Sequence, residues 1–305
     1  MAGKDDEPSN VTRLHLQQSG LNVKPQSQTE PIWALSETIL EQRDRRDSRA
    51  LALRTEPVEG VDGAFLVPDV LSDAECATLV NLCDRLGFSG GETLVEVPTK
   101  IRNNQVSLLV PPVEMVLEVA HRLRPLIPSE GCGQGKRTDP DFINRRWRVY
   151  RYAPPDGDDV ANAGFFAPHF DAAQPRSAIK DGMLIDDEPV KGVTRLSQLS
   201  VLLYLTDGHE GGHTIFYPDG MAAGAEHARR VRVSPRKGAA LVFWHGRHPL
   251  SPLHEGAPLT STDTSPKYVI RTDVLFATDP PLVNDMEWGS SSYVNAMLMA
   301  SAKMK

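Results

Sequence analysis

Six short runs rich in β-branched and aromatic residues fill the second half of the chain, and they constrain the fold more than any other feature. The runs span residues 147–152, 198–205, 213–218, 230–235, 239–244 and 267–276. Turn residues separate them, as is typical of strands in a barrel or sandwich. Helical patterns precede these runs. We therefore predict an α+β, mainly β fold: a double-stranded β-helix (jelly-roll) barrel with supporting N-terminal helices.

Two helices are predicted upstream of the strands. Ser72 and Glu75 have the spacing of a capping box, and an apolar face repeats along the residues that follow. The run at 111–128 begins and ends with prolines, which suit a helix start and mark a helix end.

The composition divides the chain into three parts. Residues 59–280 are predicted to form one domain, with helical support at 59–140 and the jelly-roll core at 141–280. Residues 1–58 are predicted to be a polar, partly disordered N-terminal extension, in which Ile32, Leu35 and Ile39 could line a short helix. Residues 281–305 form a C-terminal tail.

The charge balance argues against two classes of partner. The net charge of −7 gives no overall basic field for nucleic acid, and no apolar run approaches the ~20 residues of a membrane span. The first residues lack the pattern of a secretory signal, and the three cysteines lack metal-site spacing. A cytoplasmic, possibly nuclear, protein is expected, and the sequence indicates no particular oligomeric state.

His169 and Asp171 stand two residues apart, a spacing that puts both side chains on one face of a strand. With a second, distant histidine they would form a 2-His-1-carboxylate triad, which leaves coordination positions open for a cosubstrate and oxygen. His245, His248 and His254 compete for the third place. His254 is favoured because it stands shortly before two cations that could bind a keto acid.

Those cations, Lys267 and Arg271, share one strand face with Val269. Either could pair with a carboxylate, a contact worth roughly 1.5–3 kcal/mol when shielded from water. Tyr204 could donate its hydroxyl to the same carboxylate. The alternative interpretation, nearly as well supported, is that Tyr204 is a core tyrosine whose hydroxyl has another partner.

A competing motif is His209-Glu210-Gly211-Gly212-His213, which matches the H-E-x-x-H signature of zinc proteases. That motif needs a helix to bring both imidazoles together. Two adjacent glycines would cost about 2 kcal/mol of helix propensity relative to alanine. The strand-like flanks favour a hairpin instead.

The motifs between about 61 and 277, taken in order, resemble the prolyl 4-hydroxylase-like branch of the Fe(II)/2-oxoglutarate oxygenases. The matching segments are RVYRYAPP with FFAPHFDA, LSVLLYLTDG, EGGHTIFYP, VSPRKGAALVFW, and HEGAPLTSTDTSPKYVIRTDVLF. The resemblance implies Fe(II), 2-oxoglutarate, O₂ and ascorbate as cofactors and reactants. It also implies that His169, Asp171 and His254 bind iron and that Lys267 binds the C5 carboxylate of 2-oxoglutarate.

Further roles follow from the same resemblance. Tyr204 takes the place of a tyrosine that contacts 2-oxoglutarate, and Tyr152 that of a tyrosine near the cosubstrate. Arg271 has no settled counterpart and is a second candidate for the cosubstrate or the substrate. The gap of 13 residues between His254 and Lys267 is longer than usual for the family, and insertions lie near 173–196 and 220–229.

The expected activity is hydroxylation of an unactivated C–H, with release of succinate and CO₂. A protein or peptide residue is the first expectation for the substrate, and the segment 89–108, with Arg102 and Asn104, would then be a substrate-side loop. One alternative is a small-molecule hydroxylase whose insertions form a closed lid. Another is a non-catalytic binding domain on a degenerate barrel.

Overall fold

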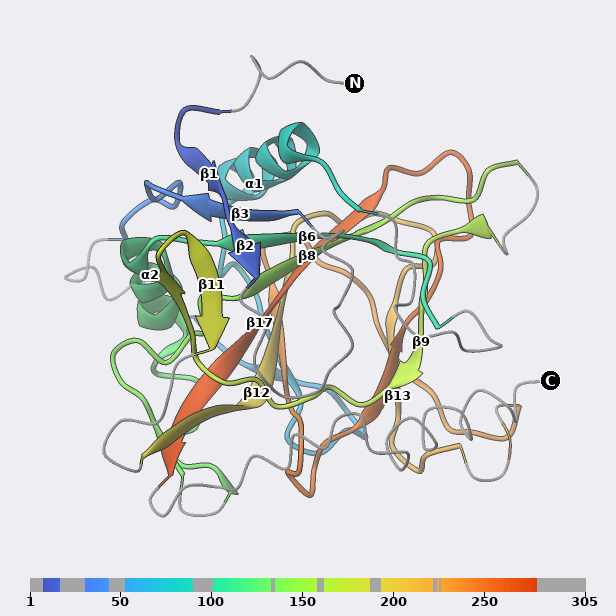
Figure 1. Cartoon of the computed structure of the whole chain (residues 1–305). Coiled ribbons are helices and arrows are strands. Elements are labelled where there is room, and N and C mark those ends of the chain that lie inside the picture. The colour runs from blue at the N-terminus through green and yellow to red at the C-terminus, as the bar shows by residue number, and fades with distance from the viewer. Residues whose placement is uncertain are drawn as a thin grey trace.

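The computed structural model describes residues 8–16, 31–43, 53–89, 101–132, 135–157, 162–186, 193–221, 224 and 226–278. This part of the chain is mainly β, with two helices among many strands (Figure 1). The predicted fold class, a jelly roll with supporting helices, is confirmed.

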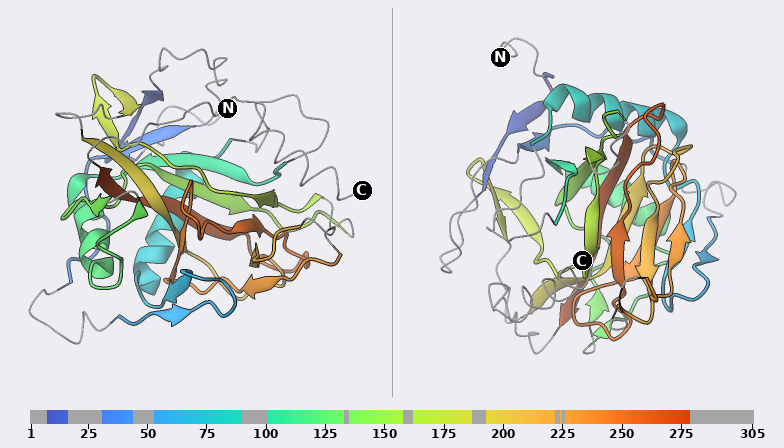
Figure 2. Two further views of the ribbon diagram at one scale, coloured as in Figure 1. Left: turned by 90° about the horizontal axis from the view of Figure 1, so that it is seen from below. Right: turned by 90° about the vertical axis from the view of Figure 1, so that its right-hand side faces the viewer.

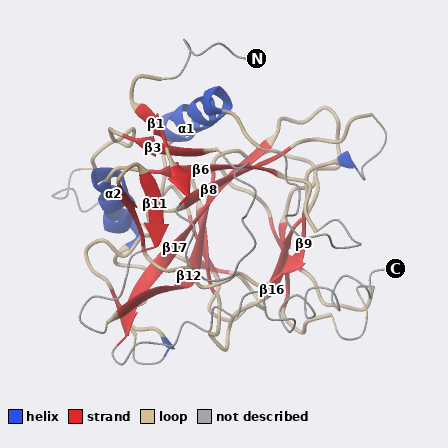
Figure 3. Ribbon diagram, in the orientation of Figure 1, coloured by secondary structure: helices blue, strands red, loops and turns tan. Residues whose placement is uncertain are grey.

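Both predicted helices are present. Helix α1 spans Asp73–Leu86, and its start is the predicted capping box, in which the Ser72 hydroxyl accepts from the Glu75 N–H and the Glu75 carboxylate accepts from the Ser72 N–H. Helix α2 spans Val113–Leu123 and begins after Pro112. The two helices lie on the same side of the molecule, away from β9 and β16 (Figure 3).

A large sheet forms the body of the molecule, and its neighbouring strands run side by side (Figure 2). In spatial order its strands are β1 (Val11–Arg13), β3 (Ile32–Leu35), β6 (Gln105–Val110), β8 (Trp147–Tyr152), β17 (Lys267–Thr278), β12 (Thr194–Tyr204), β15 (Ala240–Trp244), β5 (Phe65–Val67) and β4 (Glu56–Pro57), with β7 (Lys136–Arg137) beside β17.

Two smaller sheets complete the fold. The four-stranded sheet contains β14 (Val231–Val233), β13 (Thr214–Tyr217), β16 (Leu253–Gly256) and β9 (Phe166–His169) in that order. The three-stranded sheet contains β10 (Ser177–Lys180), β11 (Met183–Asp186) and β2 (His15–Leu16).

Strand alternation separates two apolar clusters on the two faces of the large sheet. On β12, Leu199, Val201 and Leu203 belong to the cluster that includes the buried faces of α1 and α2. Leu202 and Tyr204 belong to the second cluster, which Phe216 of β13 joins from the four-stranded sheet. The candidate site therefore lies on the face of the large sheet that is turned away from the helices.

The N-terminal extension contributes more structure than its composition predicted. Ile32–Leu35 is strand β3, which pairs in parallel with β6, so the short helix predicted there is wrong. Ile32, Trp33 and Leu35 are buried, because the strand lies inside the large sheet and not at its edge. Three segments of the extension, 1–7, 17–30 and 44–52, lie outside the described residues.

The segment predicted as helical support, 59–140, also carries strands β5, β6 and β7. Residues 90–100 of the predicted substrate-side loop and the whole tail at 281–305 lie outside the described residues. No helix in the described ranges is long and apolar enough to cross a membrane.

Candidate metal centre

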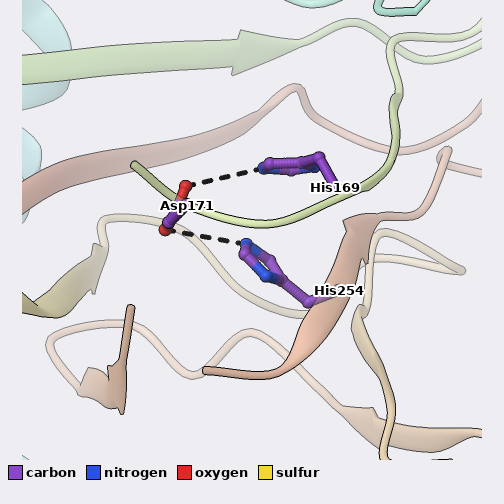
Figure 4. Close-up of side chains that lie close together, drawn as sticks. All are labelled: His169, Asp171 and His254. Carbon is purple, nitrogen blue, oxygen red and sulfur yellow. Dashed lines mark ion pairs between the residues drawn. The ribbon is translucent and has the colours of Figure 1, made fainter. Parts of the chain in front are cut away.

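Three predicted ligands meet between the ends of β9 and β16. His169 is the last residue of β9, Asp171 follows two residues later, and His254 lies on β16 as the Cα partner of His169. The Nε2 atoms of His169 and His254 lie 3.6 and 3.7 Å from the two carboxylate oxygens of Asp171, and both imidazoles point toward that carboxylate (Figure 4). One ligand atom from each residue lies within 4.8 Å of the others.

The backbone orients both imidazoles for metal binding. His169 Nδ1 lies 2.7 Å from the carbonyl oxygen of Ala167, and His254 Nδ1 lies 3.2 Å from that of Pro252. A neutral imidazole that donates its Nδ1–H to a carbonyl has its Nε2 lone pair free as a ligand. Two imidazole nitrogens and one carboxylate are the donor set that suits non-haem Fe(II), so these residues fit the metal.

The charge states also suit a cation. Burial alone would raise the pKa of Asp171, but the charge of Arg271, together with the contacts of the two imidazoles, holds it well below its ordinary value. Burial, with the neighbouring His169, lowers the pKa of His254 to about 3. The carboxylate is therefore ionised and the His254 imidazole neutral at physiological pH, as metal ligands must be.

Aromatic rings fix the planes of the two imidazoles. Phe166 stacks on His169 with ring centroids 3.7 Å apart and an angle of 14° between the planes. Phe243 meets His254 edge to face at 4.7 Å. These apolar contacts exclude water from one side of each ligand.

A hollow opens beside the three ligands. Its lining combines apolar rings and chains with a few polar groups: Tyr150, Tyr152, Phe166, His169, Asp171, Leu202, Thr214, His254, Glu255, Gly256, Lys267, Val269 and Arg271. This composition is typical of a small-ligand site, in which apolar walls surround a few fixed polar contacts.

The two cations of β17 differ in their partners. Lys267 is 1% exposed, and its Nζ donates a 2.6 Å hydrogen bond to the Gly212 carbonyl oxygen. Burial lowers the pKa of Lys267 to about 7. Arg271 instead lies beside the candidate ligand Asp171, with Nε 3.2 Å from Asp171 Oδ2 and Nη2 3.0 Å from Asp273 Oδ1.

The sequence model of the 2OG-Fe(II) oxygenase superfamily matches residues 148–272. This range contains every group named so far in the site except Asp273. This segment is a 2OG-Fe(II) oxygenase domain. The superfamily implies Fe(II), 2-oxoglutarate and O₂, and the enzyme is an oxidoreductase.

Several solved structures are similar to this chain at low identity and low TM-score. One is the viral collagen prolyl hydroxylase of Paramecium bursaria Chlorella virus-1 in complex with 2OG, with 19% identity and a TM-score of 0.43 over 70% of this chain and 96% of that one. A Pseudomonas putida prolyl-4-hydroxylase has 17% identity and a TM-score of 0.40 over 70% and 91%. The epimerase SnoN in complex with Fe³⁺, alpha-ketoglutarate and nogalamycin RO has 16% identity and a TM-score of 0.42 over 71% and 79%. No curated protein sequence matches the chain.

The two predicted tyrosines of the oxygenase domain lie beside Lys267. The ammonium is 4.5 Å from the ring centroid of Tyr152 and 5.9 Å from that of Tyr204. The Tyr204 hydroxyl forms a 2.8 Å hydrogen bond with Thr214, which lines the hollow. A Cβ on Gly256 would lie 2.6 Å from the Tyr152 hydroxyl, so the glycine leaves room for this ring.

The two predicted substrate residues lie in different surroundings. Arg102 pairs with Phe166 through an isolated bridge, and its guanidinium lies 5.9 Å from the Phe166 ring centroid. Asn104 is fully buried and is not among the residues that line the hollow.

The H-E-x-x-H motif is not a zinc site. Gly211 and Gly212 have φ of +79° and +66°, which no α-helix permits, and the segment is a loop that joins β12 to β13. These two strands belong to different sheets, so the predicted hairpin is also wrong. Within the described residues, His169, Asp171 and His254 form the one group of three with metal-ligand spacing.

One role in the site was missed from the sequence. His245, considered there only as a competing third ligand, is 1% exposed and is linked to Asp171 through a single hydroxyl. Ser200 lies between them, 2.6 Å from Asp171 Oδ2 and 2.8 Å from His245 Nδ1. His248, the other competitor, stacks on Trp244 with ring centroids 3.8 Å apart.

Proposed function

We propose that His169, Asp171 and His254 bind Fe(II) in a dioxygenase that hydroxylates an unactivated C–H of a protein or peptide residue. The observation that carries the proposal is the meeting of these three ligands in one hollow with Lys267, a buried cation without a carboxylate partner among the described residues. A degenerate, non-catalytic barrel would have no reason to retain both features.

The residues around the hollow have separate roles in the proposed reaction. Lys267 holds the C5 carboxylate of 2-oxoglutarate, and the Tyr152 ring covers the ammonium on one side. When bound, Fe(II) supplies the oxidation, in which 2-oxoglutarate and O₂ are converted to succinate and CO₂ with one oxygen atom placed on the substrate. Phe166 and Leu202 line the hollow and keep bulk water from the reacting C–H bond.

A peptide substrate is proposed on the resemblance of the ordered motifs to prolyl 4-hydroxylases. The alternative, a small-molecule enzyme with a lid built from the insertion after Asp171, receives no support from the described part of that insertion. Strands β10 and β11 form a hairpin there, β11 pairs with β2, and Leu184 packs against Leu14 and Ile32. No residue of 173–186 or 193–196 lines the hollow.

Three further features belong to the proposal. Ascorbate is the proposed reductant that keeps the iron ferrous. The cytoplasm, possibly the nucleus, is the proposed compartment. The substrate is the one proposed partner, with neither a nucleic acid nor a membrane.

The experiment is a screen of peptide and metabolite libraries by succinate release, with mass spectrometry to detect a gain of one oxygen. We expect a peptide to gain the oxygen, and His254→Ala to lose all turnover. His248→Ala is the matched control, because His248 lies outside the ligand group on the same stretch of chain. Wild-type turnover by His254→Ala would refute the ligand assignment, and oxidation of metabolites alone would refute the peptide substrate.

A further inference from the structure

A continuous run of buried hydrogen bonds ends on the carboxylate of Asp171. The Gln174 backbone N–H donates to Ser197 Oγ at 2.8 Å, and Ser197 Oγ lies 2.8 Å from His245 Nε2. His245 Nδ1 lies 2.8 Å from Ser200 Oγ, which lies 2.6 Å from Asp171 Oδ2. All four side chains are at most 5% exposed.

The position of each proton in this run follows from the inventory of donors. An ionised carboxylate only accepts, so Ser200 donates to Asp171 and must accept from His245 Nδ1–H. Burial lowers the pKa of His245, so the ring is neutral and its Nε2 accepts from the Ser197 hydroxyl. Every donor therefore points the same way, toward the proposed metal ligand, and such chains polarise one another.

A β-bulge in β12 makes this run possible. In a regular strand Ser197 and Ser200 would point to opposite faces, because they are three residues apart. The register of β12 against β17 shifts between Ser197 and Leu199, which leaves Gln198 as an extra residue. Both hydroxyls thus reach the same imidazole, while the carbonyl of Gln198 accepts the backbone N–H of His245 at 2.9 Å.

A second set of contacts fixes the same carboxylate and the loop that carries it. Arg271 Nε lies 3.2 Å from Asp171 Oδ2, and the Gly246 N–H donates to the Asp171 carbonyl at 3.0 Å. Oδ2 therefore accepts from Ser200, lies beside Arg271 Nε and is 3.7 Å from His254 Nε2, whereas Oδ1 lies 3.6 Å from His169 Nε2.

We propose that Ser200 and His245 are positioning residues that hold Asp171 in the orientation the metal requires, with Ser197 and the bulge at Gln198 holding His245. The proposal rests on the ligand assignment made above. Groups that hydrogen-bond to metal ligands typically change metal affinity about ten- to a hundredfold when they are removed. The same size of effect is expected here.

The test measures metal affinity and not turnover. Isothermal titration calorimetry with Mn(II) alone compares the wild-type chain with Ser200→Ala, and thermal unfolding is recorded without metal. We expect Ser200→Ala to raise the Kd for Mn(II) about ten- to a hundredfold and Ser197→Ala, one step further away, to raise it less. Ser200→Thr keeps the hydroxyl and should restore most of the affinity, which a merely structural role would not explain.

Other outcomes separate the two proposals. Wild-type Mn(II) affinity in Ser200→Ala, together with its loss in His254→Ala, would overturn the positioning role and leave the ligand assignment intact. Absence of Mn(II) binding by the wild-type chain would instead defeat the ligand assignment. If Ser200→Ala does not fold, His245→Gln decides the question in the same way, with His248→Gln as the matched control.

Discussion

Lys267 donates a 2.6 Å hydrogen bond to the carbonyl oxygen of Gly212 and pairs with no carboxylate among the described residues. A buried ammonium with a single neutral acceptor is costly, because charge is poorly solvated away from water. The Tyr152 ring at 4.5 Å offsets part of this cost. An anionic ligand that enters the hollow would offset more of this cost, so the buried ammonium favours binding of a carboxylate.

The first prediction concerns which cation binds 2-oxoglutarate. Lys267→Ala removes the charge-assisted contact, worth about 1.5–3 kcal/mol, so the KM for 2-oxoglutarate should rise about ten- to a hundredfold with a smaller change in kcat. Steady-state succinate release at varied 2-oxoglutarate concentration measures both constants. A larger rise in KM for Arg271→Ala than for Lys267→Ala would show that Arg271 is the anchor.

The second prediction is a pH dependence with a defined sign. Burial lowers the pKa of Lys267 to about 7, whereas a bound carboxylate favours its charged form and raises the pKa. Above pH 7 binding must take up a proton, so the Kd for 2-oxoglutarate should rise by at most about tenfold per pH unit, and it should be nearly constant below pH 7. Calorimetry on the Mn(II)-loaded protein between pH 6 and pH 9 measures this.

Lys267→Arg is the control for that pH dependence. Arginine remains charged throughout this range, so the part of the pH dependence that comes from residue 267 should disappear. An equally steep rise in the variant would assign the titration to another group.

Strand alternation accounts for the part of the site that the sequence could predict. Lys267, Val269 and Arg271 share a face because the regular part of β17 has period 2. The same reasoning predicted His169 and Asp171 on one strand face, but β9 ends at His169, so Asp171 meets it from beyond the strand. Alternation is local, so it is visible in the residues themselves.

The arrangement beneath Asp171 could not be found in the same way. The role of His245 depends on a bulge at Gln198, and a bulge is a property of pairing between two strands and not of one strand's composition. Strand β3 was missed for a related reason, since four residues carry too little periodicity to distinguish a strand from a helix turn.

The third prediction follows from the contacts of Arg271. In Arg271→Gln, Asp171 and Asp273 would lose their shared countercharge while both remain at most 5% exposed. Removing one partner of a buried ionic cluster costs about 3–5 kcal/mol, so the free energy of unfolding of the metal-free protein should fall by about that amount. Urea unfolding with and without Mn(II) is the measurement.

Mn(II) should recover part of the loss in this variant, because the ion supplies a positive charge to Asp171. The gain in unfolding free energy on adding Mn(II) should therefore be larger for Arg271→Gln than for the wild type. An equal gain would mean that Arg271 and the metal do not act on the same carboxylate.

The last prediction concerns the attachment of the N-terminal segment to the helices. Arg122, at the end of α2, is fully buried and contacts Glu75 and Glu118 at 2.8 Å, while the backbone N–H of Glu41 donates to Glu75. Arg122→Met would leave two buried carboxylates without the cation that contacts them directly, so the free energy of unfolding should fall by about 3–5 kcal/mol.

Arg124→Met is the matched control for Arg122→Met. Arg124 pairs with Asp139 at 3.4 Å but is 54% exposed, and such surface pairs contribute at most about 1 kcal/mol. Urea denaturation should therefore separate two arginines that are two residues apart by several kcal/mol. Similar small losses in both variants would show that the buried cluster around Arg122 does not hold the N-terminal segment against the helices.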